Sequence, residues 1–188
     1  MLVGERVVLR DWRRSDVEVV HGAVAGDVRL HAVTDEHPWL PRSLEVAVQR
    51  YEKRLAEPDP AAVGFALSRK DDPAEGCLGT AVLWGLNQHQ RTAHLGLTLV
   101  PAARGQGLGR EAVGLLCRYA FEVRDLHRLQ LETLAGNIAM QRAAEACGFV
   151  PEGRLRRNAW VMGERQDELI FGLLAEEWRD VPRGQAGE

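Results

Sequence analysis

The sequence predicts one α/β domain in which a mixed, mostly antiparallel sheet of about seven strands is flanked by about four helices. Three observations support this fold class. The chain has 188 residues, which suits one domain around a single core. Before residue 100, three apolar segments joined by short polar turns predict an antiparallel meander. After residue 100, helical and strand patterns alternate.

The first half of the chain is expected to hold a strand, two helices and the meander. The first strand covers Val3 to Arg10. Ser15, with Glu18 three residues later, forms a capping box that predicts a helix to about Ala25. Gly26 to Pro41 is expected to be an irregular connection. A second helix and three meander strands follow at Ser43 to Leu55, Ala62 to Ser68, Cys77 to Gly85 and Thr92 to Val100.

The second half is expected to alternate helices and strands. The expected elements are a helix at Leu108 to Val123, a strand at Leu126 to Leu134, a helix at Asn137 to Cys147, and strands at Phe149 to Asn158 and Glu168 to Leu174. The domain is expected to cover residues 1–180, and the polar residues 181–188 are expected to form a flexible tail.

Charge and composition exclude several function classes. A net charge of −3 gives no basis for general nucleic-acid binding. The one basic cluster, Arg154, Arg156 and Arg157, is expected on the solvated face of a strand. No run of eighteen apolar residues is present to span a membrane, and Met1 to Arg10 lacks a secretory h-region, so a cytoplasmic protein is expected. The three cysteines lack CxxC spacing and are expected to be reduced and buried.

The most informative segment passes from an apolar strand end through a glycine-rich turn into a helix. Its sequence is Leu99-Val100-Pro101-Ala102-Ala103-Arg104-Gly105-Gln106-Gly107-Leu108-Gly109-Arg110. The first turn of a helix has unpaired N–H groups and the positive end of the helix dipole, and glycines let a ligand approach this backbone closely. These features predict a phosphate-binding site. A tight turn without a ligand is the alternative explanation.

Two motifs together resemble the GNAT family of acyl-CoA N-acetyltransferases. The segment from Arg104 to Gly109 matches the pyrophosphate loop of that family at Arg104, Gly107 and Gly109. Further along the chain, Asn137 followed by Gly148-Phe149 matches a second family motif. The order of expected elements also resembles the family. The segments Val7 to Asp16, Ala93 to Leu97 and Glu168 to Leu174 resemble its ribosomal-protein N-terminal acetyltransferase branch (RimJ/RimL type), which also contains enzymes acting on small amines.

The resemblance implies transfer of an acetyl group from acetyl-CoA to a primary amine, either a protein N-terminus or a small molecule. Backbone amides of the loop would hold the pyrophosphate and the Arg104 side chain would add a cation. The pantetheine arm would pair with the backbone of Leu99 and Val100, and Asn137, which also suits a helix N-cap, would contact the arm or the thioester. No metal is expected. The implied co-substrate residues are Leu99, Val100, Arg104, Gly105, Gln106, Gly107, Leu108, Gly109, Arg110 and Asn137.

His94 is the candidate catalytic base. Acetyl transfer needs a neutral amine, so a base must take the ammonium proton. His94 occupies the position where this branch often has glutamate, on the strand face that it shares with Gly96 and Thr98. An imidazole titrates near neutrality, so it suits this role directly or through water. A half-buried histidine without a catalytic role is the alternative. His31 and His37 are expected to be surface or substrate-wall residues.

Two positions depart from the family pattern and leave the general acid open. Met140 replaces a serine of many relatives, and Ala144 replaces a tyrosine that protonates the leaving thiolate. Solvent, Tyr119 and Cys147 stay open as proton donors, although Cys147 is expected to be a buried helix residue. The same departures would fit a non-catalytic acyl-CoA-binding module.

A second rival function is an NAD(P)-binding enzyme. Gly107-x-Gly109-x-x-Ala112 satisfies the dinucleotide fingerprint, and Glu132 lies about 20 residues further on. The antiparallel meander before the turn disfavours this assignment, because the fingerprint opens a series of parallel crossover units. Four tryptophans are candidates either for an acceptor cleft or for the core or a subunit interface, and they are Trp12, Trp39, Trp84 and Trp160. The chain is also a candidate homodimer.

Overall fold

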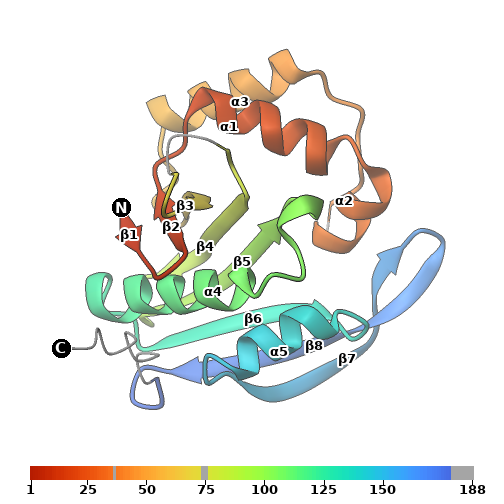
Figure 1. Cartoon of the computed structure of the whole chain (residues 1–188). Coiled ribbons are helices and arrows are strands. Elements are labelled where there is room, and N and C mark those ends of the chain that lie inside the picture. The colour runs from red at the N-terminus through yellow and green to blue at the C-terminus, as the bar shows by residue number, and fades with distance from the viewer. Residues whose placement is uncertain (36, 73–75, 179–188) are drawn as a thin grey trace.

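The computed structural model describes residues 1–35, 37–72 and 76–178. Over these ranges the chain forms an eight-stranded sheet in the order β1-β2-β3-β4-β5-β6-β8-β7 (Figure 1). Neighbouring strands are antiparallel except for β5 and β6, which are parallel. The predicted mixed, mostly antiparallel α/β fold is therefore confirmed. The expected tail at 181–188 lies outside the described residues.

The strands follow the predicted order with one addition at the start of the chain. The expected strand from Val3 to Arg10 is two strands, because Leu2 and Val3 turn back to pair with Leu9 and Val8. The bounds are β1 Leu2–Val3, β2 Val7–Arg10, β3 Val63–Arg69, β4 Gly79–Asn87, β5 Thr92–Leu99, β6 Arg128–Leu134, β7 Val150–Val161 and β8 Glu164–Leu174.

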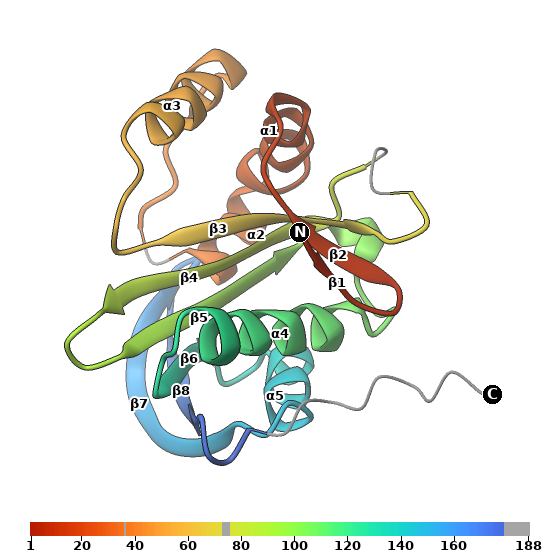
Figure 2. The same ribbon diagram turned by 90° about the vertical axis from the view of Figure 1, so that its left-hand side faces the viewer.

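The helices lie on both faces of the sheet. Figure 2 shows α1 and α3 on one side of the β2–β5 region and α4 and α5 on the other. The helices are α1 Arg14–Val20, α2 Val28–Thr34, α3 Leu44–Ala56, α4 Leu108–Arg118 and α5 Ile138–Glu145. π-helical turns at His21–Ala25 and Tyr119–Val123 extend α1 and α4. No helix within the described ranges is long and apolar enough to cross a membrane.

Two expectations about the N-terminal helices are wrong. The segment from Gly26 to Pro41 is not wholly irregular, because Asp27 caps α2 by accepting hydrogen bonds from the Arg29 and Leu30 amides. The capping box at Ser15 also does not form. The helix begins one residue earlier, and the Asp16 carboxylate accepts the Arg13 amide at 2.7 Å. In both cases an aspartate supplies the acceptor that helix starts require.

The two faces of the central strands differ in burial. On the face toward α4, Ala81, Leu83, Leu95, Leu129 and Leu131 are at most 3% exposed. The cysteines Cys77, Cys117 and Cys147 are also buried and free, as predicted. The opposite face of β4, β5 and β6 carries half-exposed or exposed side chains, which are Val82, Trp84, His94, Gln130 and Glu132. A substrate can therefore reach the side chains of this second face.

A buried ion pair fixes α1 against the sheet. The Arg10 guanidinium donates to both Asp16 carboxylate oxygens at 2.7 and 2.8 Å, and its Nε donates to Ser68 at 2.9 Å. Burial alone would raise the pKa of Asp16. The hydrogen bonds from Arg10 and from the Arg13 amide outweigh it and lower this pKa from its ordinary value of 3.8. The Arg10 side chain, through Asp16 and Ser68, thus joins β2 to α1 and β3.

Replacing Asp16 with asparagine should destabilise the protein by about 3–5 kcal/mol at neutral pH, because it leaves Arg10 buried without a counter-charge. A carboxylate with a lowered folded pKa stabilises the fold above its unfolded pKa. The difference between the wild type and Asp16→Asn should therefore shrink as the pH falls below about 3.8, toward the lowered pKa of the folded state. Urea unfolding at several pH values measures it.

Ser15→Ala is the matched control, since Ser15 is exposed and does not cap α1. It should change the free energy of unfolding by less than about 0.5 kcal/mol. A loss for Ser15→Ala as large as that for Asp16→Asn would contradict the assigned cap.

Candidate active site

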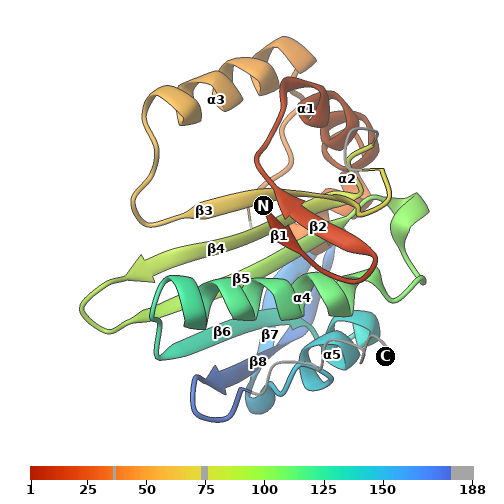
Figure 3. The same ribbon diagram turned by 60° about the vertical axis from the view of Figure 1, so that its left-hand side comes forward.

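The parallel strands β5 and β6 pair only at their beginnings. Thr92, Ala93 and His94 lie opposite Arg128, Leu129 and Gln130, and the pairing ends there. Beyond this point β5 stays paired with β4 as far as Leu99, and β6 stays paired with β8 as far as Leu134. The inner edges of the two strands therefore open toward their carboxyl ends. Figure 3 shows α4, which connects them, lying alongside this region.

The backbone of β5 presents polar groups to this opening. The Val100 amide donates to the Leu78 carbonyl on the β4 side. Antiparallel pairing alternates, so the polar groups of Leu97 and Leu99 point to the opposite edge, where β6 has left, although the Leu99 carbonyl accepts from Arg104. The Val100 carbonyl accepts from Ala103, so both polar groups of Val100 are engaged within the protein. An extended ligand would meet Leu97 and Leu99 rather than Val100.

The glycine-rich turn lies at the open end of this pair. After β5, the backbone passes through a 3₁₀ turn at Pro101–Ala103 and reaches α4 through Gly105 and Gly107, which have φ of +73° and +74°. These left-handed conformations favour glycine. No side chain caps the first turn of α4. Its N-terminal amides therefore have the arrangement that binds phosphate at helix starts.

Arginines surround the loop, but Arg104 holds the loop itself. Its guanidinium donates twice to the Leu99 carbonyl, at 2.9 and 3.1 Å. Arg6 donates to the Gln106 carbonyl at 3.0 Å and pairs with Glu111, while Arg69 donates to the Gln106 side chain at 2.7 Å. Arg6 and Arg69 come from the N-terminal strands, so three cations meet at the turn. This charge suits a pyrophosphate.

Asn137 forms the N-cap that its position predicted. Its side-chain oxygen accepts the Met140 amide at 3.3 Å, and its nitrogen donates to Thr133 at 3.0 Å. The residue follows β6, so it lies at the same carboxyl edge as the glycine loop. The Cys147 thiol, at the other end of α5, donates to the Arg110 carbonyl at 3.4 Å and ties the two helices together.

His94 lies on the exposed face where β5 and β6 part. Its Nδ1 lies 3.1 and 3.2 Å from the two carboxylate oxygens of Glu132 on β6. The Glu132 carboxylate also accepts from the Gln130 side chain at 2.6 Å. The His94 and Glu132 side chains are 31% and 27% exposed, so solvent or a substrate can reach them. A carboxylate on Nδ1 makes that nitrogen the protonated one and leaves Nε2 able to accept a proton.

Neighbouring residues hold the imidazole in place. The Trp84 ring stacks on it with centroids 4.2 Å apart and planes at 23°. A Cβ built on Gly85, whose φ is +60°, would lie 3.1 Å from His94 Cδ2, so glycine leaves room for the ring. His94 therefore has a single orientation, set by a stacking partner and a hydrogen-bond acceptor.

Among the described residues, none of the candidate general acids contacts His94. Ala144 is fully buried, and burial raises the pKa of Cys147 to about 11. The Cys147 thiol is therefore a buried structural group, as predicted. The Tyr119 ring packs edge-on against Phe65 at 5.1 Å. Among the described residues, these contacts assign no side chain to the protonation of the leaving thiolate.

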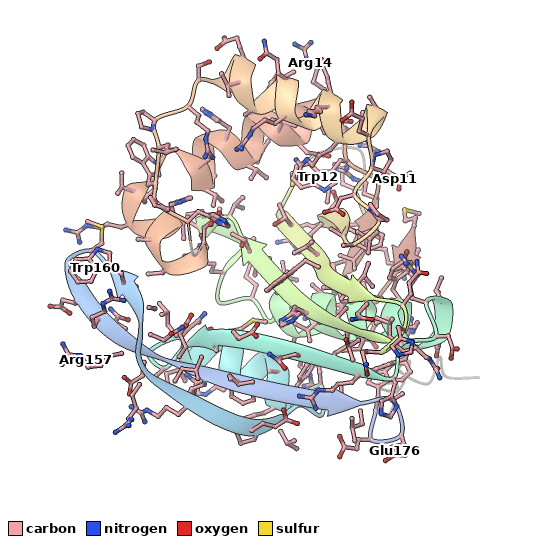
Figure 4. All side chains as sticks on the ribbon, turned by 180° about the vertical axis from the view of Figure 1, so that it is seen from behind. Asp11, Trp12, Arg14, Arg157, Trp160 and Glu176 are labelled. Atoms are coloured by element: carbon pink, nitrogen blue, oxygen red, sulfur yellow. The ribbon has the colours of Figure 1, made fainter. Side chains whose placement is uncertain are left out.

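The tryptophans do not gather in one cleft. Trp12 and Trp39 line a pocket between α1, α2 and α3, with His31 also in its wall. Trp84 lies at His94, and Trp160 is 62% exposed on β7. Figure 4 shows Trp12 near the helices and Trp160 on the distant hairpin of β7 and β8. His37 lies outside both sites, where it pairs with Asp35 at 2.9 Å.

The family follows from comparison with known proteins. Residues 6–150 match the model of the acetyltransferase (GNAT) domain. The chain belongs to the GNAT acetyltransferase family. It is an acyl-CoA-dependent N-acetyltransferase with acetyl-CoA as its co-substrate. The dinucleotide assignment of the glycine turn fails on topology, because β5-α4-β6 is the only parallel crossover in the part of the chain that the structure describes.

The GNAT chain is similar to enzymes with different named acceptors. It is 24% identical to spermidine N(1)-acetyltransferase of Vibrio cholerae over 94% of this chain and 97% of that one. It is 32% identical to the putative ribosomal N-acetyltransferase YdaF of Bacillus subtilis over 53% of this chain and 55% of that one. The crystal structure of the Vibrio enzyme with CoA and spermine matches with a TM-score of 0.80 at 23% identity, covering 91% and 96% of the chains.

Sequence reasoning missed the contributions of Glu132, Trp84, Arg6 and Arg69. Glu132 entered only as a possible ribose ligand of a dinucleotide. Its partnership with His94 depends on which strands become neighbours and in which register, and no local motif encodes that. One signal was present: Arg128, Gln130 and Glu132 alternate with Leu129 and Leu131, which puts polar side chains on one face of this strand.

Gly107→Ala should weaken CoA binding about tenfold. The left-handed backbone costs a residue with a Cβ about 1–2 kcal/mol. The added Cβ would also lie 3.3 Å from the Arg6 guanidinium. Calorimetric titration with CoA measures the change. Gly114→Ala is the control, since a Cβ there meets nothing within 4 Å. Equal affinity for the two variants would argue against the loop as the pyrophosphate site.

Proposed function

We propose that the protein acetylates a primary amine by direct attack within a ternary complex. Acetyl-CoA would lie with its pyrophosphate on the Arg104–Arg110 loop and its pantetheine arm in the opening between β5 and β6. His94 would act as the base. The observation that carries this proposal is the His94–Glu132 pair, which lies where the two strands separate.

The chemistry assigns one step to the histidine. The amine nitrogen attacks the thioester carbonyl, a C–N bond forms, the C–S bond breaks and the CoA thiolate leaves. His94 Nε2 takes the ammonium proton, directly or through one water, so that a neutral amine attacks. The Leu97 amide, which is the nearer of the two to His94, would donate to the carbonyl oxygen as negative charge develops on it, and the Leu99 amide is left for the pantetheine arm.

Glu132 acts through His94 as a positioning residue. Its carboxylate fixes the tautomer, and the attraction between carboxylate and imidazolium stabilises the protonated form after the transfer. This arrangement would replace the glutamate that the family branch often carries at position 94. The carboxylate is that of Glu132 on the neighbouring strand, and the His94 imidazole would lie between it and the substrate. A non-catalytic module would not need such a pair, so the pair favours an enzyme.

The acceptor class is a primary amine of a small molecule or of a protein N-terminus. The spermidine enzyme named above supports a small-molecule acceptor, and the putative ribosomal enzyme supports a protein acceptor. The comparisons therefore do not select the ribosomal-protein branch of the family. A cell-free panel of polyamines, amino acids, aminoglycosides and peptides, with thiol release as the readout, tests the class. Binding of CoA without thiol release on any acceptor would sink the proposal in favour of an acyl-CoA-binding module.

Self-association is part of the proposal. β7 is an edge strand, and Leu155, Trp160 and Met162 expose 40%, 62% and 54% of their surface on the β7–β8 hairpin. The solved structures similar to this chain include a dodecameric spermidine N-acetyltransferase. Unpaired edges with exposed apolar side chains favour association with a second copy, so a homodimer is the smallest assembly proposed.

His94→Ala should lower the turnover number about 100-fold at pH 7 and less at pH 9, where more of the amine is already neutral. Glu132→Gln should lower turnover about tenfold at pH 7 with an unchanged KM for acetyl-CoA. An amide can face either tautomer, so it no longer selects the one that accepts the proton. Steady-state kinetics from pH 6 to 9 with any acceptor from the panel measure both effects.

The double variant separates positioning from an independent role. If Glu132 acts through the imidazole, adding Glu132→Gln to His94→Ala should change turnover by less than twofold. Multiplying effects in the double variant, or a parallel pH profile for His94→Ala and wild type, would remove the dyad from the mechanism.

A further inference from the structure

A second hollow lies on the helical side of the molecule. It has a volume of about 490 Å³ and lies between α1, α2, α3 and the segment before α3. This size falls in the range of small-molecule sites, about 300–1,000 Å³. No residue of the glycine loop and neither His94 nor Glu132 lines it. The acetyl-transfer chemistry therefore does not account for it.

One wall of this pocket is cationic. Arg50, Lys53 and Arg54 are exposed residues of α3 that line the pocket, spaced three and four apart, so they share one face of the helix. Arg42 lines it from the segment before α3. Within the described ranges Arg42 and Arg50 form no ion pair with a carboxylate. Arg42 and Arg50 therefore face the pocket rather than a protein carboxylate.

The opposite wall is apolar and aromatic. Val17 and Val20 of α1 line the pocket, together with Trp12 and Trp39. Trp39 is fixed by a hydrogen bond of 2.8 Å from its indole to the Ala25 carbonyl. Trp12 lies over β3, where a Cβ built on Gly64 would be 3.6 Å from its indole nitrogen, and the Tyr51 hydroxyl donates to its carbonyl at 3.1 Å. Both ring positions are thus set before any ligand arrives.

The balance of charge decides the ligand class. Among the described residues that line the pocket, Glu57 is the only carboxylate, and Lys53 lies 3.9 Å from it. The lining thus holds four Lys or Arg side chains against one acid, beside low-dielectric ring faces that strengthen the field. We propose that this pocket binds an organic anion, a carboxylate or phosphate ester with an apolar or aromatic body.

The proposal reaches beyond the acetyl-transfer assignment and does not depend on it. The chemistry is opposite to that of a polyamine, which would meet like charge on α3. The anion has two possible sources: the acidic part of the amine acceptor, or a separate ligand. Both present the same chemistry to the pocket.

The test is binding of 2-naphthoate to the full chain saturated with CoA, measured by calorimetry, so that the pyrophosphate site is already filled. The proposal expects 2-naphthoate to bind. The primary amines 2-naphthylmethylamine and spermidine, which the proposed function admits as acceptors, should displace it only at concentrations at least about tenfold higher. Arg50→Glu should weaken the binding of 2-naphthoate at least about tenfold, since it reverses one charge of the wall. Circular dichroism checks that the variant is folded.

Arg156→Glu is the matched control, because it makes the same charge change at an exposed position of β7, away from the pocket. It should leave the affinity for 2-naphthoate within twofold. Equal weakening in the two variants, unchanged affinity in Arg50→Glu, or displacement of 2-naphthoate by an equal concentration of the amine would overturn the proposal. Loss of acetyl transfer in the kinetic experiments above would not, because this assay measures binding alone.

A kinetic arm distinguishes the two sources. If the anion is part of the acceptor, 2-naphthoate should compete with the acceptor and not with acetyl-CoA. If it is a separate ligand, the KM for the acceptor should not change as the concentration of 2-naphthoate is raised above its dissociation constant.

Discussion

The separation of β5 from β6 is the constraint on which the site depends. Each strand follows its outer neighbour, β4 or β8, so the pair opens after His94 and Gln130. A backbone edge without a partner is costly when buried, so an opening of this kind needs a ligand or water to satisfy the polar groups of Leu97 and the Leu99 amide. The pantetheine arm of CoA is an extended chain of amides, and an added strand is the geometry that such an edge accepts.

The same separation assigns the two substrates to different places. The carboxyl ends of the parallel pair lead to the glycine loop on one side and to Asn137 on the other, so the proposed complex would have the anionic half of CoA at the start of α4. His94, the proposed base, lies at the closed end of the opening, on the face that α4 does not cover. In this proposal the acceptor would approach from the side of α1 and α3, where the cationic pocket also lies.

Local sequence determined much of this fold but little of the catalytic pair. Period-two and period-3.6 patterns placed the meander, α3 and α4 close to their observed bounds, and two motifs identified the loop and Asn137. Two N-caps were misjudged because short aspartate-started turns resemble loops: Asp27 begins α2, and Asp16 rather than Ser15 completes the cap of α1. The His94–Glu132 contact and the arrival of Arg6 and Arg69 at the loop depend on strand order, which no local pattern carries.

Amide hydrogen exchange, followed residue by residue with and without CoA, tests the central claim most directly. Protection should rise at the Leu97 and Leu99 amides, which face the opening, and at the first amides of α4. The Val100 amide already donates to Leu78 at 2.9 Å and should not change. Unchanged exchange at both leucines, with protection appearing elsewhere on the sheet, would contradict the account.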